Sequence, residues 1–219
     1  MSEIFIAMES GTWVSPAPAS YLLESELQNL LMSSPELIPG IDSALAVCRE
    51  FPTGAGPIDL LVIDDQGGLT IIECKLNNNA EIRRKIIGQT LDYASALWRM
   101  QIPEFRARWL KQSELALEVT FGDHSEVHLS MIDDALQKGR FNLILAVDQI
   151  NDSLERIVTY LNHVTKPEIN VYAAEFQKLT VNGLDAYSVS TFGLEQIAAK
   201  EIPSQSNKEW WANDAYRIC

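Results

Sequence analysis

Short apolar runs separated by turn residues dominate the first half of the chain. The residues from Ile58 to Ile63 and from Leu69 to Leu76 are mostly apolar, and the turn between them contains Gly67 and Gly68. Runs of this length favour β-strands, and glycines favour tight connections. Ala44 to Phe51 alternates loosely enough to add a strand before them. The pattern therefore predicts consecutive strands at 44–51, 58–63 and 69–76.

Other segments have the helical period or further strand signals. Leu23, Leu27, Leu30 and Leu31 repeat at helical spacing behind Ser20, a residue type that favours a helix N-cap. The remaining expected elements are a short strand near 4–8, helices at 21–32, 80–99, 103–112 and 153–161, a strand buried on both faces at 141–147, and strands at 171–176 and 186–189 around the turn Asn182-Gly183.

The order of these elements predicts one mixed α/β domain over residues 1–219. A helix, three strands, a helix and a further strand give the order αβββαβ. We expect its core at about 20–165 and a C-terminal extension at 166–219 that adds strands. The chain contains no internal repeat or low-complexity linker that would favour two domains.

Charge and composition narrow the function. The chain has 47% hydrophobic residues and a net charge of −13, which counts against a nucleic-acid-binding protein because the phosphate backbone repels an acidic surface. Basic residues nevertheless predominate locally between residues 83 and 111. They are Arg83, Arg84, Lys85, Arg99, Arg106, Arg108 and Lys111. Both a basic binding face and ordinary solvated helix positions remain open for this basic stretch.

Cysteine usage and hydropathy indicate a cytoplasmic protein. Cys48, Cys74 and Cys219 are odd in number and far apart, which argues against a disulfide framework or a zinc site. Cys74 is most simply a small core residue. No apolar stretch approaches the ~20 residues that span a bilayer, and the run 4–8 lacks a basic leader. We therefore expect no membrane association.

Three polar residues interrupt the apolar strands and need an explanation. Asp59 lies in the strand 58–63, and Glu73 and Lys75 end the strand 69–76. Side chains alternate along a strand, so Glu73 and Lys75 share one face while Cys74 points to the other. Two carboxylates and an amine on neighbouring strands outline a divalent-metal site. A partly buried salt-bridge cluster without catalysis is the alternative.

These residues resemble the PD-(D/E)XK nuclease superfamily, whose fold is the restriction-endonuclease-like mixed sheet. Asp59 in Gly56-Pro57-Ile58-Asp59 matches the second motif and Glu73-Cys74-Lys75 the third. The acid on the opening helix is best matched by Glu24, with Glu26 as the fallback. Gln89-Thr90-Leu91-Asp92-Tyr93 fits the Gln-x-x-x-Tyr motif of RecB-type members. The chain departs from the family pattern because Ile58 separates Pro57 from Asp59.

The resemblance implies a nuclease that hydrolyses DNA with Mg²⁺, for which Mn²⁺ can substitute. Its metal ligands would be Asp59, Glu73 and the backbone carbonyl of Cys74, while Lys75 would orient or help deprotonate the attacking water. Glu24 would bind through water or hold a second metal. The residues expected to contact DNA or to hydrogen-bond the groups around the metal are Gln89, Tyr93, Arg83 and Arg84. The alternatives are an inactive nuclease-fold protein that binds nucleic acid or protein, and a subunit whose basic face needs a homodimer or another partner.

A histidine pair and a tryptophan pair give only weak indications of a binding site. His124 and His128 have the spacing of zinc ligands on a helix, but Gly122 and the β-favouring Val119-Thr120-Phe121 argue against a helix there. Residues 113–130 otherwise predict no element. Trp210 and Trp211 could stack on bases, but a terminal aromatic pair more commonly docks on its own domain or on a partner.

Overall fold

The computed structural model describes residues 4–9, 11–41, 43–76 and 82–201. The side chains of residues 82–84 and 198–201 lie outside this description, as do Trp210, Trp211 and Cys219. No helix in the described ranges combines the length and hydropathy that a membrane crossing requires.

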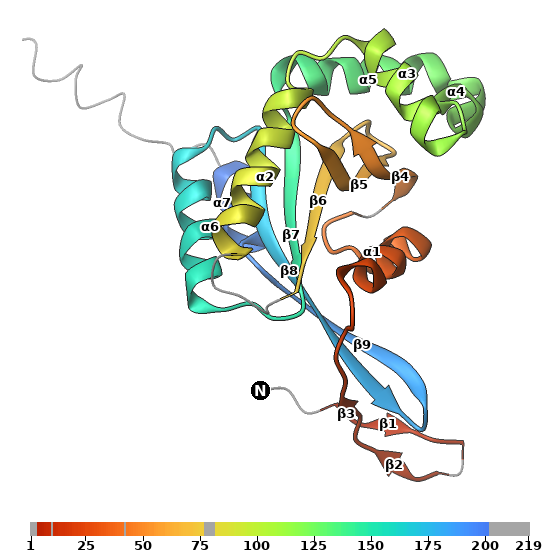
Figure 1. Cartoon of the computed structure of the whole chain (residues 1–219), viewed down its shortest axis with the longest axis vertical. Coiled ribbons are helices and arrows are strands. Elements are labelled where there is room, and N and C mark those ends of the chain that lie inside the picture. Colours follow the sequence, from red (N-terminus) through yellow and green to blue (C-terminus); the bar gives the residue numbers. More distant parts are fainter. Residues whose placement is uncertain (1–3, 10, 42, 77–81, 202–219) are drawn as a thin grey trace, which may run out of the picture.

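The core is a seven-stranded mixed sheet with the strand order β3-β8-β7-β6-β5-β4, in which β3 is Ala17–Pro18, and β9 (Leu184–Phe192) pairs with β8. The strands β4 (Ala44–Pro52), β5 (Pro57–Asp64) and β6 (Leu69–Lys75) form an antiparallel meander. β7 (Phe141–Val147) runs parallel to β6, and β8 (Ile169–Val181) runs parallel to β7. The predicted mixed α/β fold with strands added after residue 165 is confirmed, and Figure 1 shows the sheet at the centre of the molecule.

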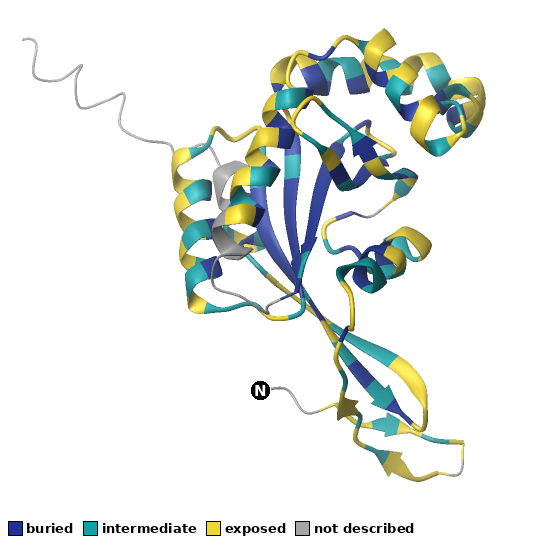
Figure 2. Cartoon of the chain, viewed as in Figure 1, coloured by how far each residue is buried: buried dark blue, intermediate teal, exposed yellow. Residues whose placement is uncertain are grey.

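Helices cover both faces of this sheet. One face packs against α2 (Ile82–Leu97), α3 (Ile102–Ser113), α4 (Leu117–Phe121), α5 (Ser125–Lys138) and α6 (Asp152–Val164). The other face packs against α1 (Glu24–Ser33), the 3₁₀ turn η1 (Pro35–Leu37) and α7 (Leu194–Glu201). The two apolar clusters leave β6 and β7 almost fully buried, as the dark strands in Figure 2 show. Charged side chains on these strands are therefore exceptional.

The first helix begins later than predicted. The helix starts at Glu24 instead of residue 21, and its N-cap is Leu23, not Ser20. The Tyr21 hydroxyl donates a 2.9 Å hydrogen bond to the carbonyl of Phe176 on β8, which fixes the preceding segment against the sheet. Long-range packing therefore sets this helix boundary in place of the local capping residue.

Most of the segment 113–130 is helical, so the argument against a helix at residues 119–122 is wrong. α4, the 3₁₀ turn η2 (Gly122–His124) and α5 follow one another here. Leu117 and Phe121 are buried one helical turn apart, whereas Val119 between them is 69% exposed. Packing of this short apolar stripe outweighs the β-propensity of Val119 and Thr120.

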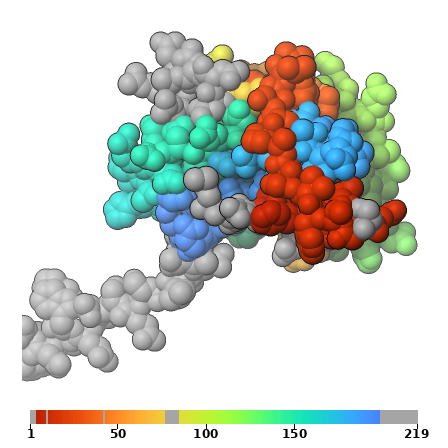
Figure 3. Space-filling model, turned by 90° about the horizontal axis from the view of Figure 1, so that it is seen from below, coloured from red at the N-terminus to blue at the C-terminus, as the bar shows by residue number. Residues whose placement is uncertain are grey.

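An arm projects from the sheet at its far end. β8 continues past β7 and forms a hairpin with β9 (Leu184–Phe192), whose turn holds Asn182 at φ 50° and Gly183 at φ 81°. The predicted hairpin is confirmed, although both strands are longer than 171–176 and 186–189. The N-terminal strands are β1 (Ile6–Ala7), β2 (Trp13–Val14) and β3 (Ala17–Pro18), of which β3 pairs with β8. Figure 3 shows this red N-terminal segment packed beside the blue hairpin.

Capping of α6 gives a testable stability effect. The side chain of Asn151 accepts a 3.2 Å hydrogen bond from the backbone N–H of Leu154. We expect Asn151→Ala to lower the free energy of unfolding by about 1 kcal/mol because this N–H loses its acceptor. Urea denaturation should show the loss, and Asn151→Ser should recover most of it. Equal stability of the alanine variant and the wild type would show that the cap contributes nothing.

Candidate active site

The site lies where β5 and β6 stop pairing. Their last paired residues are Leu60 and Ile72, so Asp59 and Glu73 are the next residues on the two diverging strands. The backbone N–H of Cys74 donates a 2.8 Å hydrogen bond to Asp59 Oδ2. A carboxylate therefore replaces the missing strand neighbour, and the separation of the strands places an acidic side chain between them.

Lys75 is the centre on which the acidic side chains converge. Its Nζ lies 3.0 Å from Glu73 Oε1, 3.2 Å from Glu24 Oε2 and 3.9 Å from Asp59 Oδ2. The same ammonium donates a 3.0 Å hydrogen bond to the carbonyl of Cys74. The residues predicted from three separate motifs thus meet at one place, while their roles in catalysis stay a prediction.

The acid from the opening helix is Glu24, and the fallback Glu26 lies elsewhere. Glu24 is the first residue of α1 and its side chain is 38% exposed. Glu26 instead accepts a hydrogen bond from the N–H of Leu22 and pairs with Lys178 of β8 at 3.4 Å. Glu26 therefore stabilises the start of α1 and its attachment to the arm, whereas Glu24 faces the cluster.

Burial and mutual repulsion dominate the electrostatics of the carboxylates. Burial, and then the neighbouring Asp59, raise the pKa of Glu73 to about 7, although Lys75 opposes the shift. Burial also raises the pKa of Asp59, against the opposing effects of the Cys74 N–H, Lys75 and a hydrogen bond from Gln28. Burial lowers the pKa of Lys75, but the surrounding carboxylates outweigh it and the net shift is upward. The lysine therefore acts as the counter-ion of the cluster.

The donor set fits a hard divalent cation. Glu73 is 1% exposed, and its buried Oε2 has no hydrogen-bond partner among the residues that the structure describes, while Lys75 pairs with Oε1 of the same carboxylate. Asp59 and the Cys74 carbonyl add further oxygens, the ligand type that Mg²⁺ prefers. No group of three His, Cys, Asp or Glu side chains in the described ranges forms a ready-made metal centre. In this structure the Lys75 ammonium lies between these oxygens, where it pairs with the carboxylates.

Gln89 and Tyr93 line the side of the site formed by α2. Gln89 Nε2 donates a 3.3 Å hydrogen bond to the Tyr93 hydroxyl, and the buried Gln89 Oε1 has no partner in the described part of the chain. Burial, and then the charge of Glu73, raise the pKa of Tyr93. The Tyr93 ring also borders Gly56, whose φ of 130° turns the chain into β5. Arg83 and Arg84 lie in the first turn of α2, where their side chains are outside the described part of the chain.

Two further polar residues belong to the neighbourhood of the site and had not been singled out from the sequence. Gln28 of α1 is 7% exposed and hydrogen-bonds Asp59. Its Oε1 accepts a 2.8 Å hydrogen bond from Arg49 Nη2 of β4. In the sequence, the one signal for Gln28 is its position one helical turn after Glu24.

The basic stretch is partly neutralised. Arg106 forms an ion pair with Glu118, and Arg108 pairs with Glu104 at 2.6 Å. Arg99 lies over the Trp98 ring at 4.6 Å. These contacts favour the interpretation that much of this stretch has structural partners on its own helices.

The two histidines have local contacts. His128 Nδ1 lies 2.9 Å from the backbone carbonyl of His124, and the His128 ring stacks on Phe121 with the centroids 4.8 Å apart. These contacts give His128 a role in packing α5 against α4.

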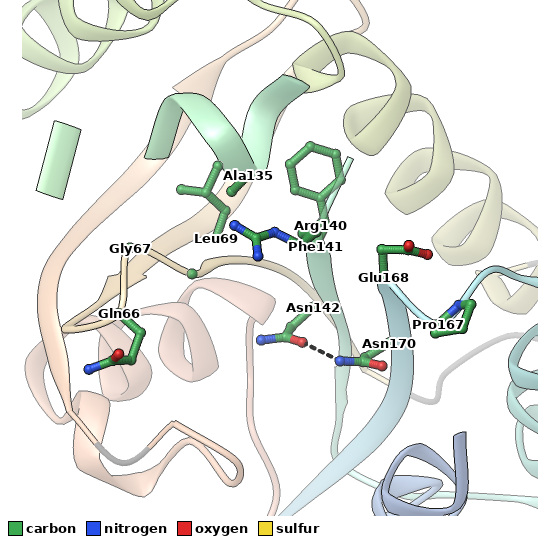
Figure 4. A pocket seen from close by; sticks show the side chains of 11 residues that line it. Gln66, Gly67, Leu69, Ala135, Arg140, Phe141, Asn142, Pro167, Glu168 and Asn170 are labelled. Carbon is green, nitrogen blue, oxygen red and sulfur yellow. Dashed lines mark hydrogen bonds between the residues drawn. The ribbon is translucent and has the colours of Figure 1, made fainter. Parts of the chain in front are cut away.

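A pocket of about 400 Å³ lies at the opposite end of the sheet (Figure 4). It is bordered by the β5–β6 turn and by the starts of β7 and β8. Asn170 Nδ2 donates a 3.0 Å hydrogen bond to Asn142 Oδ1 within it, and Arg140 is paired with Asp134 at 2.5 Å. Glu73 and Lys75 are at the other end of β6, so this pocket does not contribute to the cluster.

Comparison with known families identifies one region of similarity. The family described as Endonuclease NucS C-terminal domain matches residues 23–95. These residues run from the N-cap of α1 into the last turn of α2 and include Glu24, Asp59, Glu73 and Lys75. No curated protein and no solved structure matches the chain. The similarity therefore covers the part of the chain that forms the site, and it agrees with a restriction-endonuclease-like nuclease fold.

Proposed function

We propose that this chain is a metal-dependent nuclease that hydrolyses DNA phosphodiester bonds. The convergence of Glu24, Asp59, Glu73 and Lys75 at the point where β5 and β6 diverge carries the proposal. The similarity of residues 23–95 to an endonuclease domain supports the same reaction class. The assignment of the Gln89–Tyr93 pair to a RecB-type motif is part of this proposal.

Asp59, Glu73 and the Cys74 carbonyl would hold a Mg²⁺ or Mn²⁺ ion. Such an ion stabilises negative charge on phosphoryl oxygens and lowers the pKa of bound water. The buried, unpaired Oε2 of Glu73 supports this choice of ligand because a charged oxygen without a partner is costly to bury.

The protein's own residues would position the reacting groups. The Lys75 ammonium, held by Glu24 and Glu73, donates hydrogen bonds and can orient a water or a phosphate oxygen. The Cys74 N–H holds the Asp59 carboxylate in one orientation. Gln89, with an unpaired carbonyl oxygen beside Tyr93, offers a further acceptor at the edge of the site. These side chains are supported by strands and helices instead of loops, which favours a fixed geometry.

The proposed reaction is tested by incubating the purified chain with labelled single-stranded, duplex and branched DNA. We expect cleavage with Mg²⁺ or Mn²⁺ and none with a chelator. Binding of DNA without cleavage under all these conditions would favour the alternative, an inactive nuclease-fold binding protein. If the chain neither cleaves nor binds DNA, the nuclease proposal and a nucleic-acid-binding role are both refuted, and the protein-binding alternative is left.

Loss of the Asp59 carboxylate should weaken metal binding. We expect Asp59→Asn to lower the Mg²⁺ affinity at least about tenfold, because an amide is a poorer ligand for a hard cation than a carboxylate. Isothermal titration calorimetry measures the change. Glu26→Gln is the matched control, since it removes a carboxylate of α1 that faces away from the cluster and pairs with Lys178. Unchanged affinity in Asp59→Asn would exclude Asp59 as a ligand.

A further inference from the structure

Arg49 holds an uncompensated positive charge beside the site. Its guanidinium donates to Asn29 Oδ1 at 2.5 Å and to Gln28 Oε1 at 2.8 Å, and both acceptors are neutral amides. Within the described ranges, Arg49 forms no ion pair, whereas Lys75, Arg106, Arg108, Lys138, Arg140 and Lys178 each do. A guanidinium has more N–H donors than these amides accept, so it can still bind an anion.

A polar connection leads from Arg49 to the acidic cluster. Gln28 accepts a 2.8 Å hydrogen bond from Arg49, and it also lies close enough to Asp59 to lower the pKa of that carboxyl. Glu24, Gln28 and Met32 follow one another at i, i+4 and i+8 along α1, a stripe about 12 Å long at 1.5 Å per residue. The stripe begins at the site and passes Arg49.

A groove begins where this stripe ends. It has a volume of about 600 Å³ and is lined by residues 45–50 of β4, by Met32 of α1 and by Gln112 and Ser113 of α3. β4 is the last strand of the sheet, so the groove follows a sheet edge. Its size is sufficient for a small ligand or a short stretch of an extended chain. Among the described residues that line the groove, Arg49 is the one cation and Glu50 the one acid.

We infer that Arg49 binds a backbone phosphate of the nucleic-acid strand and that the β4–α1–α3 groove holds the nucleotides beside that phosphate. The inference rests on the proposed nuclease function. A strand that enters the acidic cluster brings its own negative charges, and the phosphates next to the reacting one need a cation that the carboxylates do not already neutralise. Arg49 meets that need, and Gln28 and Asn29 hold its guanidinium in place.

The test measures DNA binding in chelator, where cleavage cannot interfere. Labelled single-stranded and duplex oligonucleotides are titrated with wild type, Arg49→Gln and Arg156→Gln, and binding is followed by fluorescence anisotropy at several salt concentrations. Arg156→Gln removes the same charge from an exposed position on α6. We expect Arg49→Gln to weaken binding about tenfold and to reduce the slope of log affinity against log salt by about 1. Arg156→Gln should keep the wild-type affinity within about twofold.

Each outcome separates the inference from the proposed function. Binding by wild type with equal affinities and slopes for the two arginine variants would overturn the inference alone. No binding by wild type in chelator would overturn the inference alone, because the nuclease proposal is overturned by absence of cleavage with Mg²⁺ and Mn²⁺. If melting curves show that Arg49→Gln is unfolded, DNA binding is compared between a second pair of variants. Leu115→Glu adds a negative charge to the groove, and Val164→Glu adds one at the end of α6. These positions are 49% and 52% exposed, so both should fold, and only Leu115→Glu should weaken binding. Equal binding by this pair would exclude the groove as the path of the strand.

Discussion

We expect Lys75→Ala to reduce DNA cleavage by about 10²- to 10⁴-fold, the range for loss of a positioned proton-transfer or charge-stabilising group. The ammonium contacts Glu73 at 3.0 Å and Glu24 at 3.2 Å, and it is the only cation that pairs with these carboxylates in the described part of the chain. Initial rates with saturating Mg²⁺ measure the loss. Lys166→Ala removes an exposed lysine from the loop before β8 and should keep the wild-type rate.

The same substitution should also destabilise the metal-free protein. Without the ammonium, Asp59 and Glu73 are left buried without a counter-ion, a loss on the order of 3 to 5 kcal/mol when one partner of a buried pair is removed. Adding Glu73→Gln to Lys75→Ala removes one of the unpaired charges, so the double variant should recover stability. It should not recover cleavage. If cleavage returned together with stability, Lys75 would have a structural role alone.

The strands of the site could be predicted from the sequence because each is specified locally. Residues 58–63 and 69–76 are apolar runs with a glycine turn, and the run 141–147 is too apolar for an exposed element. The alternation rule also places Glu73 and Lys75 on one face. The divergence of β5 and β6 after Leu60 and Ile72 has no local signal, so the contact of Asp59 with the Cys74 N–H could not be predicted.

Features that depend on distant parts of the chain were missed. The start of α5 was missed because Gly122 lies shortly before it. The helix α4 was missed because it buries just Leu117 and Phe121. Residues this few give no usable period. Gln28 was missed because its partners, Asp59 and Arg49, come from β5 and β4. In the basic stretch, the acidic partners of Arg106 and Arg108 likewise could not be read from the charge pattern alone.

Glu73 should make the metal-free protein less stable as the pH rises from about 4.5 to 7. Its pKa is raised from 4.5 to about 7 in the folded state, so the folded protein holds a proton that the unfolded chain releases. The stabilisation is therefore fully present below pH 4.5 and is lost as the pH rises through the folded pKa. A shift of this size corresponds to about 3 kcal/mol. Asp59, whose pKa is also raised, adds an effect of the same sign that begins at lower pH.

Glu73→Gln should remove most of this dependence, because an amide at the same position does not ionise. Urea denaturation at pH 5 and pH 8 in chelator measures the free energy of unfolding. At pH 8 the variant should be more stable than the wild type, by less than the free energy that corresponds to the whole pKa shift. The gain is reduced because Lys75 loses its 3.0 Å partner and keeps Glu24 and Asp59. Lys75 itself does not contribute in this window, since its pKa is raised further above neutrality. If the free energy of unfolding depends on pH in the same way for wild type and variant, ionisation of Glu73 does not destabilise the folded protein. In that case its buried Oε2 would not need a cation, and the main structural reason for placing a metal at this carboxylate would be lost.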